Sequence, residues 1–390
     1  MTETGIAIIG AGASGHSAAT TLRQEGYQGP ITLVHADRQG PYNRTLVNKA
    51  VLQGLLTAEQ IALPALDGLG IDVVADSAVA LDADRRAVRL DQGGELPYDA
   101  VIIATGANPR QTVAPAAGLR GHVFTIHTTE DAARIRDRLS TGMPEQISVT
   151  ILGAGFIGAE TASYLNGLGV SVDLVSRDLT PLAGAVGQAI GQSITELHRK
   201  HVRTHFGREI IKVSADSDAV TVLLDDQTTL TSDMVILAHG TVPSTDWIGN
   251  ATGVGIAVDE RLRAGTIEHG YAAGAVAIHR SLAGVDYRID HWDAAAVQGG
   301  HAARTLLHDY YDAPDPGPYV PTTGFTLQLY RTSIAAFGAL LPQGRQETAN
   351  PGPAGGLTTA FFSDEGRMHA ISGINAGRTL QSMRSNLKRP

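Results

Sequence analysis

The chain has 390 residues, enough for two or three domains of ordinary size, and 43% of them are hydrophobic, so it can form globular cores. It contains no cysteine, which excludes disulfides, thiolate metal sites, iron–sulfur ligation and thiol redox chemistry. Its net charge of −9 argues against nucleic acid as the main partner, because phosphate binding requires a basic surface. The N-terminal residues lack a signal-peptide pattern and no apolar run reaches about 20 residues, so we expect a cytoplasmic protein without a membrane span.

The first predicted elements are a strand and a helix joined by a glycine-rich turn. The apolar residues 6–9 predict a short buried strand, residues 18–24 predict a helix, and GAGASG connects them. In such a turn the first glycine permits tight bending, the second lets the backbone approach a pyrophosphate, and the third brings helix and strand together. The residues assigned to this dinucleotide site, at the helix N-terminus, are Gly10, Gly12, Ala13, Ser14 and Gly15.

A second predicted strand, residues 31–34, is followed by Asp37. This acid stands 22 residues after Gly15, where a carboxylate can accept hydrogen bonds from an adenosine ribose. Its charge disfavours a ribose 2′-phosphate, so the first motif predicts a dinucleotide without one. A glycine-rich turn in an unrelated α/β fold is the alternative, and the strand, helix and acid together argue against it.

The same motif is repeated as VTILGAGFIG, and the spacing from Gly15 to Gly158 is 143 residues, about the length of one domain. The predicted strand at residues 170–175 ends beside Ser176 and Arg177, where an NADH site would usually carry an acid. A guanidinium can pair with a 2′-phosphate, so the sequence favours NADPH, with a solvated Arg177 as the alternative. The residues assigned to this site are Gly153, Gly155, Phe156, Ile157, Gly158, Ser176 and Arg177.

Metal and hydrolytic chemistry have little support. His198, His201 and His205 have the spacing of one helical face, but the adjacent cations Arg199 and Lys200 repel a metal. We therefore expect a solvated helix end and no metal site. No nucleophile elbow, HExxH or P-loop is present, which leaves redox chemistry carried by a bound cofactor.

Three motifs together resemble the two-dinucleotide flavoproteins of the pyridine nucleotide-disulfide oxidoreductase superfamily. They are the two glycine motifs and YDAVIIATGANPR at residues 98–110, whose ATG turn contributes Thr105 and Gly106. Within the superfamily, GPYNRTLVNK at residues 40–49 resembles the PYxRPPLSK segment of ferredoxin reductases; the arginine and the lysine match and two prolines do not. The resemblance extends over nearly the whole chain.

The resemblance implies FAD and NADPH (or NADH) as cofactors. It implies Arg44 near the flavin pyrophosphate and Lys49 near the flavin ring, beside Glu160. Lys49 and Glu160 are therefore the expected catalytic pair, with an unrelated surface lysine as the alternative. The other residues that match cofactor-binding segments of the family are Gly240, Gly274, His291 and Trp292.

One departure from the family concerns flavin binding. Where the family has AGD, this chain has Gly274 followed by Ala275, so the carboxylate that binds a ribityl hydroxyl is missing. Loss of a hydrogen bond to a charged group would weaken FAD binding by about 10- to 100-fold. Because Ala275 stands where the family has this aspartate, we still expect it to lie in the cofactor site.

The expected fold class is α/β, with two Rossmann-like dinucleotide-binding domains and a C-terminal α+β interface domain. The expected FAD domain comprises residues 1–112 and 236–312, the NAD(P) domain 113–235 and the interface domain 313–390. Interface domains of this kind are dimeric in some relatives and monomeric in others, so a homodimer is left open.

The resemblance implies an oxidoreductase that passes a hydride from NAD(P)H to FAD and electrons onward to a ferredoxin or another iron–sulfur protein. Two alternatives stay open. Residues 322–328 lack the aromatic segment that covers one flavin face in many ferredoxin reductases, which leaves room for direct action on a small molecule. Ala275 and the missing prolines leave room for a nucleotide-binding homologue without turnover.

Overall fold

The structure is a computed structural model that describes residues 4–111, 121–216, 219–249, 253–280, 286–321, 323–338, 345–349 and 356–387. The chain forms two compact units. The first comprises Met1–Thr45, Thr57–Asn108 and Val242–Pro321, and the second Leu46–Leu56, Pro109–Thr241 and Thr322–Pro390. Residue 112, where the first FAD-domain segment is expected to end, lies outside the described residues.

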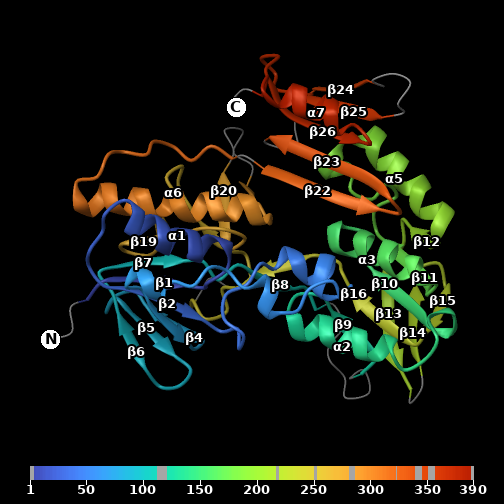
Figure 1. The fold of residues 1–390 in the computed structure, drawn as a ribbon, viewed down its shortest axis with the longest axis horizontal. Coiled ribbons are helices and arrows are strands. Elements are labelled where there is room, and N and C mark those ends of the chain that lie inside the picture. The colour runs from blue at the N-terminus through green and yellow to red at the C-terminus, as the bar shows by residue number, and fades with distance from the viewer. Residues whose placement is uncertain are drawn as a thin grey trace. The chain divides into compact units, whose positions relative to one another are not determined.

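A five-stranded parallel sheet forms the centre of the first unit (Figure 1). Its order is β19 (Gly270–Ala272), β7 (Ala100–Ile103), β1 (Ile6–Ile9), β2 (Ile31–His35) and β3 (Asp72–Ala75). Successive residues of β1 face opposite sides of the sheet: Ile6 and Ile8 pack in one core cluster, Ala7 and Ile9 in another. A parallel strand buried on both faces is typical of a doubly wound fold and explains why residues 6–9 are all apolar.

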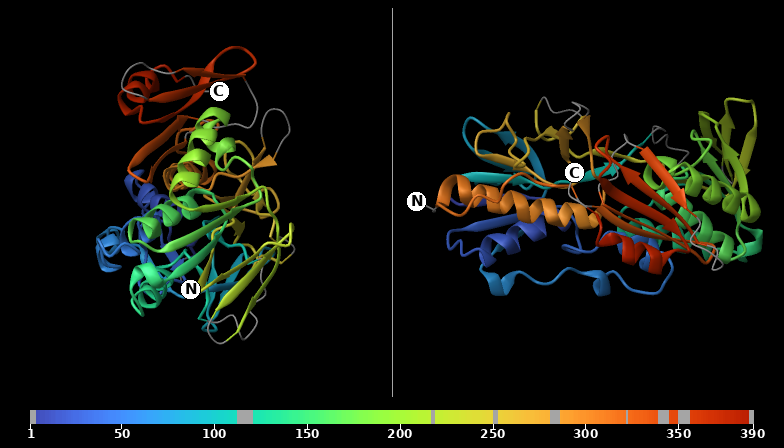
Figure 2. Two further views of the ribbon diagram at one scale, coloured as in Figure 1. Left: turned by 90° about the vertical axis from the view of Figure 1, so that its right-hand side faces the viewer. Right: turned by 90° about the horizontal axis from the view of Figure 1, so that it is seen from above.

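Two long helices cover one face of this sheet. α1 (Ala13–Gln24) and α6 (Trp292–Tyr311) lie side by side, as Figure 1 and the right-hand view of Figure 2 show. They approach closely at Gly299, where a Cβ would lie 1.9 Å from the carbonyl oxygen of Ser14. The antiparallel sheet β4 (Ala78–Asp82), β5 (Ala87–Leu90) and β6 (Glu95–Pro97) packs in the core cluster of the opposite face.

The second unit repeats this plan. Its parallel sheet has the order β12 (Arg203–Phe206), β11 (Ser171–Ser176), β10 (Ser148–Leu152), β16 (Met234–Leu237) and β9 (Val123–Thr125). The helix α3 (Phe156–Gly167) follows β10 through the second glycine turn. β11 begins and ends one residue later than the strand predicted at 170–175. The sheet β13 (Ile210–Ala215), β14 (Val220–Leu224) and β15 (Thr229–Ser232) shares a core cluster with β10, β11 and β16.

The C-terminal residues add an antiparallel sheet to the second unit. Its order is β22 (Thr323–Leu329), β23 (Thr332–Gly338), β26 (Met368–Ile374), β25 (Leu357–Phe362) and β24 (Arg345–Ala349), and α7 (Gly377–Arg384) packs against it. Leu327 and Ile334 of this sheet pack with Ala159 of α3 and Ile190 of α5 (Gln188–His201). The remaining α-helices and strands are α2 (Thr129–Leu139), α4 (Ala183–Val186), β8 (Ala107–Pro109), β17 (Thr241–Pro243), β18 (Ile256–Ala257), β20 (Ala277–Arg280) and β21 (Asp286–Tyr287). The expected division into three domains stays a prediction.

The helix end that the sequence predicts to be solvated is exposed at Arg199, Lys200 and His201 but not at His198. His198 is fully buried, and its Nδ1 lies 2.9 Å from the hydroxyl of Tyr330, while His201 stacks on the same ring at 4.2 Å. His205 lies on β12, with Nε2 2.8 Å from Asp173. The expectation is wrong for His198 because the β22–β23 turn covers it, a contact between residues 132 positions apart. No three metal-ligating side chains come together in the described part of the chain.

Candidate functional site

The first glycine turn has the shape needed to receive a pyrophosphate. Gly10 has φ +104°, which favours glycine, and a Cβ there would lie 2.3 Å from the carbonyl oxygen of Ala104. A Cβ on Gly15 would lie 1.8 Å from the carbonyl oxygen of Gly10. A Cβ on Gly12, by contrast, would meet no described atom within 4 Å. Gly12 therefore faces open space at the N-terminus of α1, which no described side chain caps, so its N–H groups can bind an anion.

The second glycine turn has nearly the same geometry. Gly153 has φ +112°, and its Cβ would lie 2.3 Å from the carbonyl oxygen of Ala238, while a Cβ on Gly158 would lie 1.9 Å from the carbonyl oxygen of Gly153. A Cβ on Gly155 would again meet no atom that the structure describes within 4 Å. Each of the two units therefore contains one strand–turn–helix module suited to a dinucleotide.

Asp37 lies just beyond β2, at the carboxyl edge of the first sheet. Its Oδ2 is 2.5 Å from Nη2 of Arg44, and both side chains are about one-third exposed. Arg44 also donates to the hydroxyl of Tyr42 at 3.1 Å and lies over that ring, 5.0 Å from its centroid. Arg44, expected beside the pyrophosphate, is thus paired with Asp37, expected to hold the ribose. The Tyr42 hydroxyl contacts both side chains.

Two chain segments are held together beside the first sheet. Thr105 Oγ1 donates to the carbonyl of Ser244 at 2.7 Å, and the carbonyl of Gly106 accepts from the Ser244 N–H at 3.0 Å. Gly106 has φ +69°, so the ATG turn requires glycine there. In the second unit, the carbonyl of Gly240 accepts from the N–H of Arg110 at 2.9 Å. These bonds join residues 105–110 to residues 240–244.

The segment around Gly274 and Ala275 lacks a carboxylate. The Gly274 N–H donates to Oε1 of the buried Gln298 at 2.8 Å, and the Ala275 carbonyl accepts from Arg288 at 3.2 Å. Nε2 of Gln298, Nε2 of His279 and the Tyr319 hydroxyl are buried without a hydrogen-bond partner among the described residues. Burial lowers the pKa of His279 to about 4, so its imidazole is uncharged at neutral pH.

Two residues expected beside the flavin ring begin α6. His291 is the N-cap residue and Trp292 the first residue of the helix, and both side chains are half-buried. Gln298 follows on the same helix and was not selected from the sequence. The QG pair that it forms with Gly299 was the available signal, because the glycine marks the close approach to Ser14.

Lys49 and Glu160 form the expected pair. Lys49 Nζ lies 3.4 Å from Glu160 Oε1 and donates to the carbonyl of Thr326 at 3.0 Å. A short π-helix, Val47–Val51, also presents Asn48, whose Nδ2 donates to Glu160 Oε2 at 2.8 Å. Burial raises the pKa of Glu160, and Lys49 and Asn48 oppose this rise. The pairing of Lys49 with a buried carboxylate argues against the alternative of an unrelated surface lysine, and the catalytic role of the pair stays a prediction.

The end of β11, where the adenosine ribose of a second dinucleotide is expected, carries a basic residue. Ser176 is buried, and its Oγ accepts from the N–H of Asp178 at 3.1 Å, while Arg177 is exposed and has no ion pair among the residues that the structure describes. Burial lowers the pKa of His239, and the positive charges of Arg110 and Arg177 lower it further. Arg110 and His239 were not selected from the sequence, although His239 lies two residues beyond the carboxyl end of β16.

Phe156 and Ile157 begin α3 and are both half-buried. The ring of Phe156 contacts that of Phe325 edge to face, with centroids 4.7 Å apart. This contact holds the first turn of α3 against β22. The N-terminus of α3, like that of α1, has no side-chain cap among its described neighbours.

A family model described as "Pyridine nucleotide-disulphide oxidoreductase" matches residues 4–299. The chain is similar to apoptosis-inducing factor 3 of Homo sapiens, with 30% identity over 96% of this chain and 61% of that protein. It is similar to the anthranilate 1,2-dioxygenase system ferredoxin–NAD(+) reductase component of Burkholderia cepacia, with 29% identity over 97% of this chain and 92% of that protein.

The fold is similar to that of the crystal structure of the ferredoxin reductase for the CYP199A2 system from Rhodopseudomonas palustris. The TM-score is 0.85 at 26% identity, over 97% of this chain and 94% of that one. The chain spans about three-fifths of the length of the first curated relatives it matches. None of the helices in the described ranges is both long and apolar enough to cross a membrane.

Proposed function

The chain belongs to the pyridine nucleotide-disulphide oxidoreductase family, and on this premise we propose that it is an FAD-dependent NAD(P)H oxidoreductase that passes electrons to a ferredoxin or similar iron–sulfur protein. FAD and a pyridine nucleotide are its cofactors. The observation that carries the proposal is the duplicated glycine turn, with an open Gly12 in one unit and an open Gly155 in the other. Because the chain has no cysteine, the thiol step found in some flavoproteins is excluded.

The residues of the first unit would hold FAD. The N–H groups at Gly12 and the start of α1 bind the pyrophosphate, and Asp37, fixed by Arg44, accepts from the adenosine ribose. When bound, FAD accepts a hydride from NAD(P)H and can release electrons singly. Lys49, which belongs to the second unit, would supply a positive charge able to stabilise the negative charge of a reduced flavin.

The second unit would bind the pyridine nucleotide. Gly155 and the N-terminus of α3 receive its pyrophosphate, and Ser176 and Arg177 lie at its adenosine ribose. The proposal includes a preference for NADPH, since the Arg177 guanidinium is exposed and has no ion pair among the described residues, and Ser176 is uncharged. The assignment of residues 1–112 and 236–312 to FAD, 113–235 to NAD(P) and 313–390 to an interface domain is also proposed, as is a cytoplasmic location.

The proposed acceptor is supported by the relatives. Several similar proteins are named as ferredoxin reductase components of dioxygenase systems, including one from Paraburkholderia xenovorans at 28% identity over 96% of this chain. The chain covers 90% of that protein. An iron–sulfur acceptor requires single-electron transfer, which a flavin can supply without a side-chain nucleophile.

The first experiment is the visible spectrum of the purified protein under anaerobic conditions, before and after addition of NADPH or NADH. We expect flavin absorption bands that bleach faster with NADPH, followed by recovery of the bands when an oxidised ferredoxin is added. Bands that bleach but do not recover with any ferredoxin would favour direct action on a small molecule.

A non-catalytic nucleotide-binding homologue is the second candidate, and Ala275 favours it. This residue is 9% exposed and leaves no carboxylate beside Gly274. A colourless protein that takes up no added FAD, yet still binds NADPH, would replace the redox proposal with this one.

A further inference from the structure

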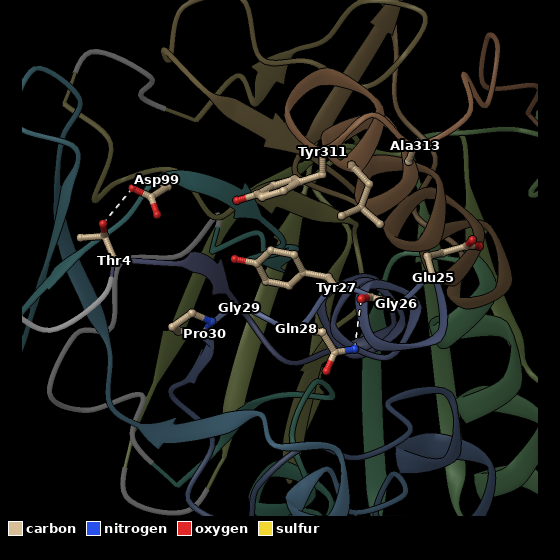
Figure 3. A pocket seen from close by; sticks show the side chains of 11 residues that line it. Thr4, Glu25, Gly26, Tyr27, Gln28, Gly29, Pro30, Asp99, Tyr311 and Ala313 are labelled. Atoms are coloured by element: carbon tan, nitrogen blue, oxygen red, sulfur yellow. Dashed lines mark hydrogen bonds between the residues drawn. The ribbon is translucent and has the colours of Figure 1, made fainter.

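A pocket of about 580 Å³ lies in the first unit, away from its glycine turn (Figure 3). Its lining includes Thr4, Pro30 and Asp99, which stand just before the strands β1, β2 and β7. Dinucleotides bind at the carboxyl ends of parallel strands, whereas this pocket lies at the amino ends. Four-residue strands span about 13 Å, so the pocket is separate from the site proposed for FAD.

Two tyrosines form an aromatic wall in this pocket. Tyr27 follows α1 and Tyr311 ends α6, and their rings meet edge to face with centroids 5.0 Å apart. Figure 3 shows both hydroxyls pointing toward the side where Asp99 lies. Burial, the hydroxyl of Tyr311 and the charge of Asp99 raise the pKa of Tyr27, so this phenol stays neutral. Tyr311 is 44% exposed, so its ring is accessible to a ligand.

Asp99 is an exposed carboxylate in the lining of the pocket. The Thr4 hydroxyl donates to its Oδ1 at 2.8 Å, and no described cation forms an ion pair with it. The other carboxylate of the lining, Glu25, is neutralised by Arg304 at 2.7 Å. Arg23, the cation beside the Tyr27 ring, keeps its positive charge, but its guanidinium donates to the backbone carbonyls of Tyr27, Gly29, Leu69 and Gly70 and forms no described ion pair with Asp99.

We propose that this pocket binds a small organic cation, an ammonium group attached to an apolar or aromatic body. The ammonium pairs with Asp99, and the body packs on Tyr27 and Tyr311, whose electron-rich faces also attract a cation. The volume lies in the range of small-molecule sites. A metal ion is less suited, since no three metal-ligating side chains converge in the described ranges. This inference does not depend on the proposed redox function.

The test is calorimetric titration of the full-length protein with phenethylamine, compared with its neutral analogue 2-phenylethanol and its anionic analogue phenylacetate. We expect one amine per chain, bound at least 10-fold more tightly than either analogue. Asp99→Asn should weaken binding of the amine at least 10-fold by removing the carboxylate charge. Tyr311→Ala should also weaken binding of the amine, because it removes one of the two aromatic rings. Asp91→Asn, at an exposed turn between β5 and β6, is the matched control and should change nothing.

Three outcomes would overturn the proposal. They are no binding up to about 10 mM amine, equal binding of the alcohol or the acid, and amine affinity unaffected by both Asp99→Asn and Tyr311→Ala. Competition between the amine and FAD or NADPH would also overturn it, because the pocket would then not be a separate site. Thermal unfolding checks that Asp99→Asn is folded, and the exposed Tyr311 provides a second variant. The titration is repeated without FAD, so failure of the redox proposal leaves its result valid.

Discussion

Ser176 and Arg177 set the charge at the ribose edge of the second dinucleotide module. The buried serine accepts a backbone hydrogen bond, and the exposed arginine has no ion-pair partner in the described part of the chain. Arg110 and His239 add further basic groups near it. A 2′-phosphate bound here would therefore be attracted by the Arg177 guanidinium, and it would meet the uncharged Ser176, not a carboxylate, at the end of β11.

We expect Arg177→Ala to lower the ratio of kcat/KM for NADPH to that for NADH by about 10- to 100-fold, because one charged hydrogen bond to the 2′-phosphate is lost. Activity with NADH should change little. The matched control is Arg199→Ala, another exposed arginine of the second unit. An unchanged ratio would mean that Arg177 is merely solvated.

Restoring the missing carboxylate with Ala275→Asp should tighten FAD binding by about 10- to 100-fold, measured by flavin fluorescence. The same change should lower the melting temperature of the FAD-free protein, since position 275 is only 9% exposed and a buried charge is costly. Ala275→Asn, which lacks the charge, should give a smaller gain in affinity. If both variants bind FAD no better than the parent, Gln298 or another group already fills this role.

At the scale of elements, the strand, glycine turn and helix act as one module that occurs twice. The outer two glycines of each turn are required by contacts within the protein, because a Cβ at either would meet backbone. The middle glycine is different: Gly12 has φ −68° and Gly155 φ −73°, values that alanine adopts readily. The fold therefore does not require glycine at this position, and we expect the glycine to serve ligand binding.

Gly12→Ala should leave the melting temperature of the FAD-free protein unchanged or slightly raised, since alanine restricts the unfolded chain. The variant should nevertheless lose FAD, because the new methyl occupies the space of the pyrophosphate. Gly155→Ala should retain FAD and lose its reduction by NADPH. Gly15→Ala, whose Cβ would lie 1.8 Å from a backbone oxygen, should be destabilised, and similar stability of Gly12→Ala and Gly15→Ala would contradict the argument.

At the scale of the whole molecule, each unit contains a buried neutral histidine. Burial lowers the pKa of His198, in the second unit, and of His279, in the first, to about 4 in each case. In the unfolded chain a histidine has a pKa near 6.5. Between these values the unfolded chain binds more protons than the folded one, so the free energy of unfolding falls as the pH falls.

The loss should approach about 3 kcal/mol for each histidine once the pH is near 4. We expect His198→Gln to have a flatter dependence of unfolding free energy on pH between about pH 7 and pH 5, measured with urea. His279→Gln should flatten it by a similar amount, and the double variant by the sum. If the unfolding free energy of the variants depends on pH as steeply as that of the parent, these histidines bind protons as readily in the folded chain as in the unfolded one.

The sequence by itself determined both dinucleotide modules, because their spacing requirements are local: strand, turn and helix lie within some 20 residues of one another. The resemblance also identified Lys49 and Glu160, 111 positions apart, which the structure pairs. Only the tertiary structure decided that Asn48 and the Thr326 carbonyl hold this pair, that Gln298 binds the Gly274 N–H, and that His198 is buried under Tyr330. These contacts join residues that are distant in the chain, and no local pattern of apolar and polar residues encodes such pairings.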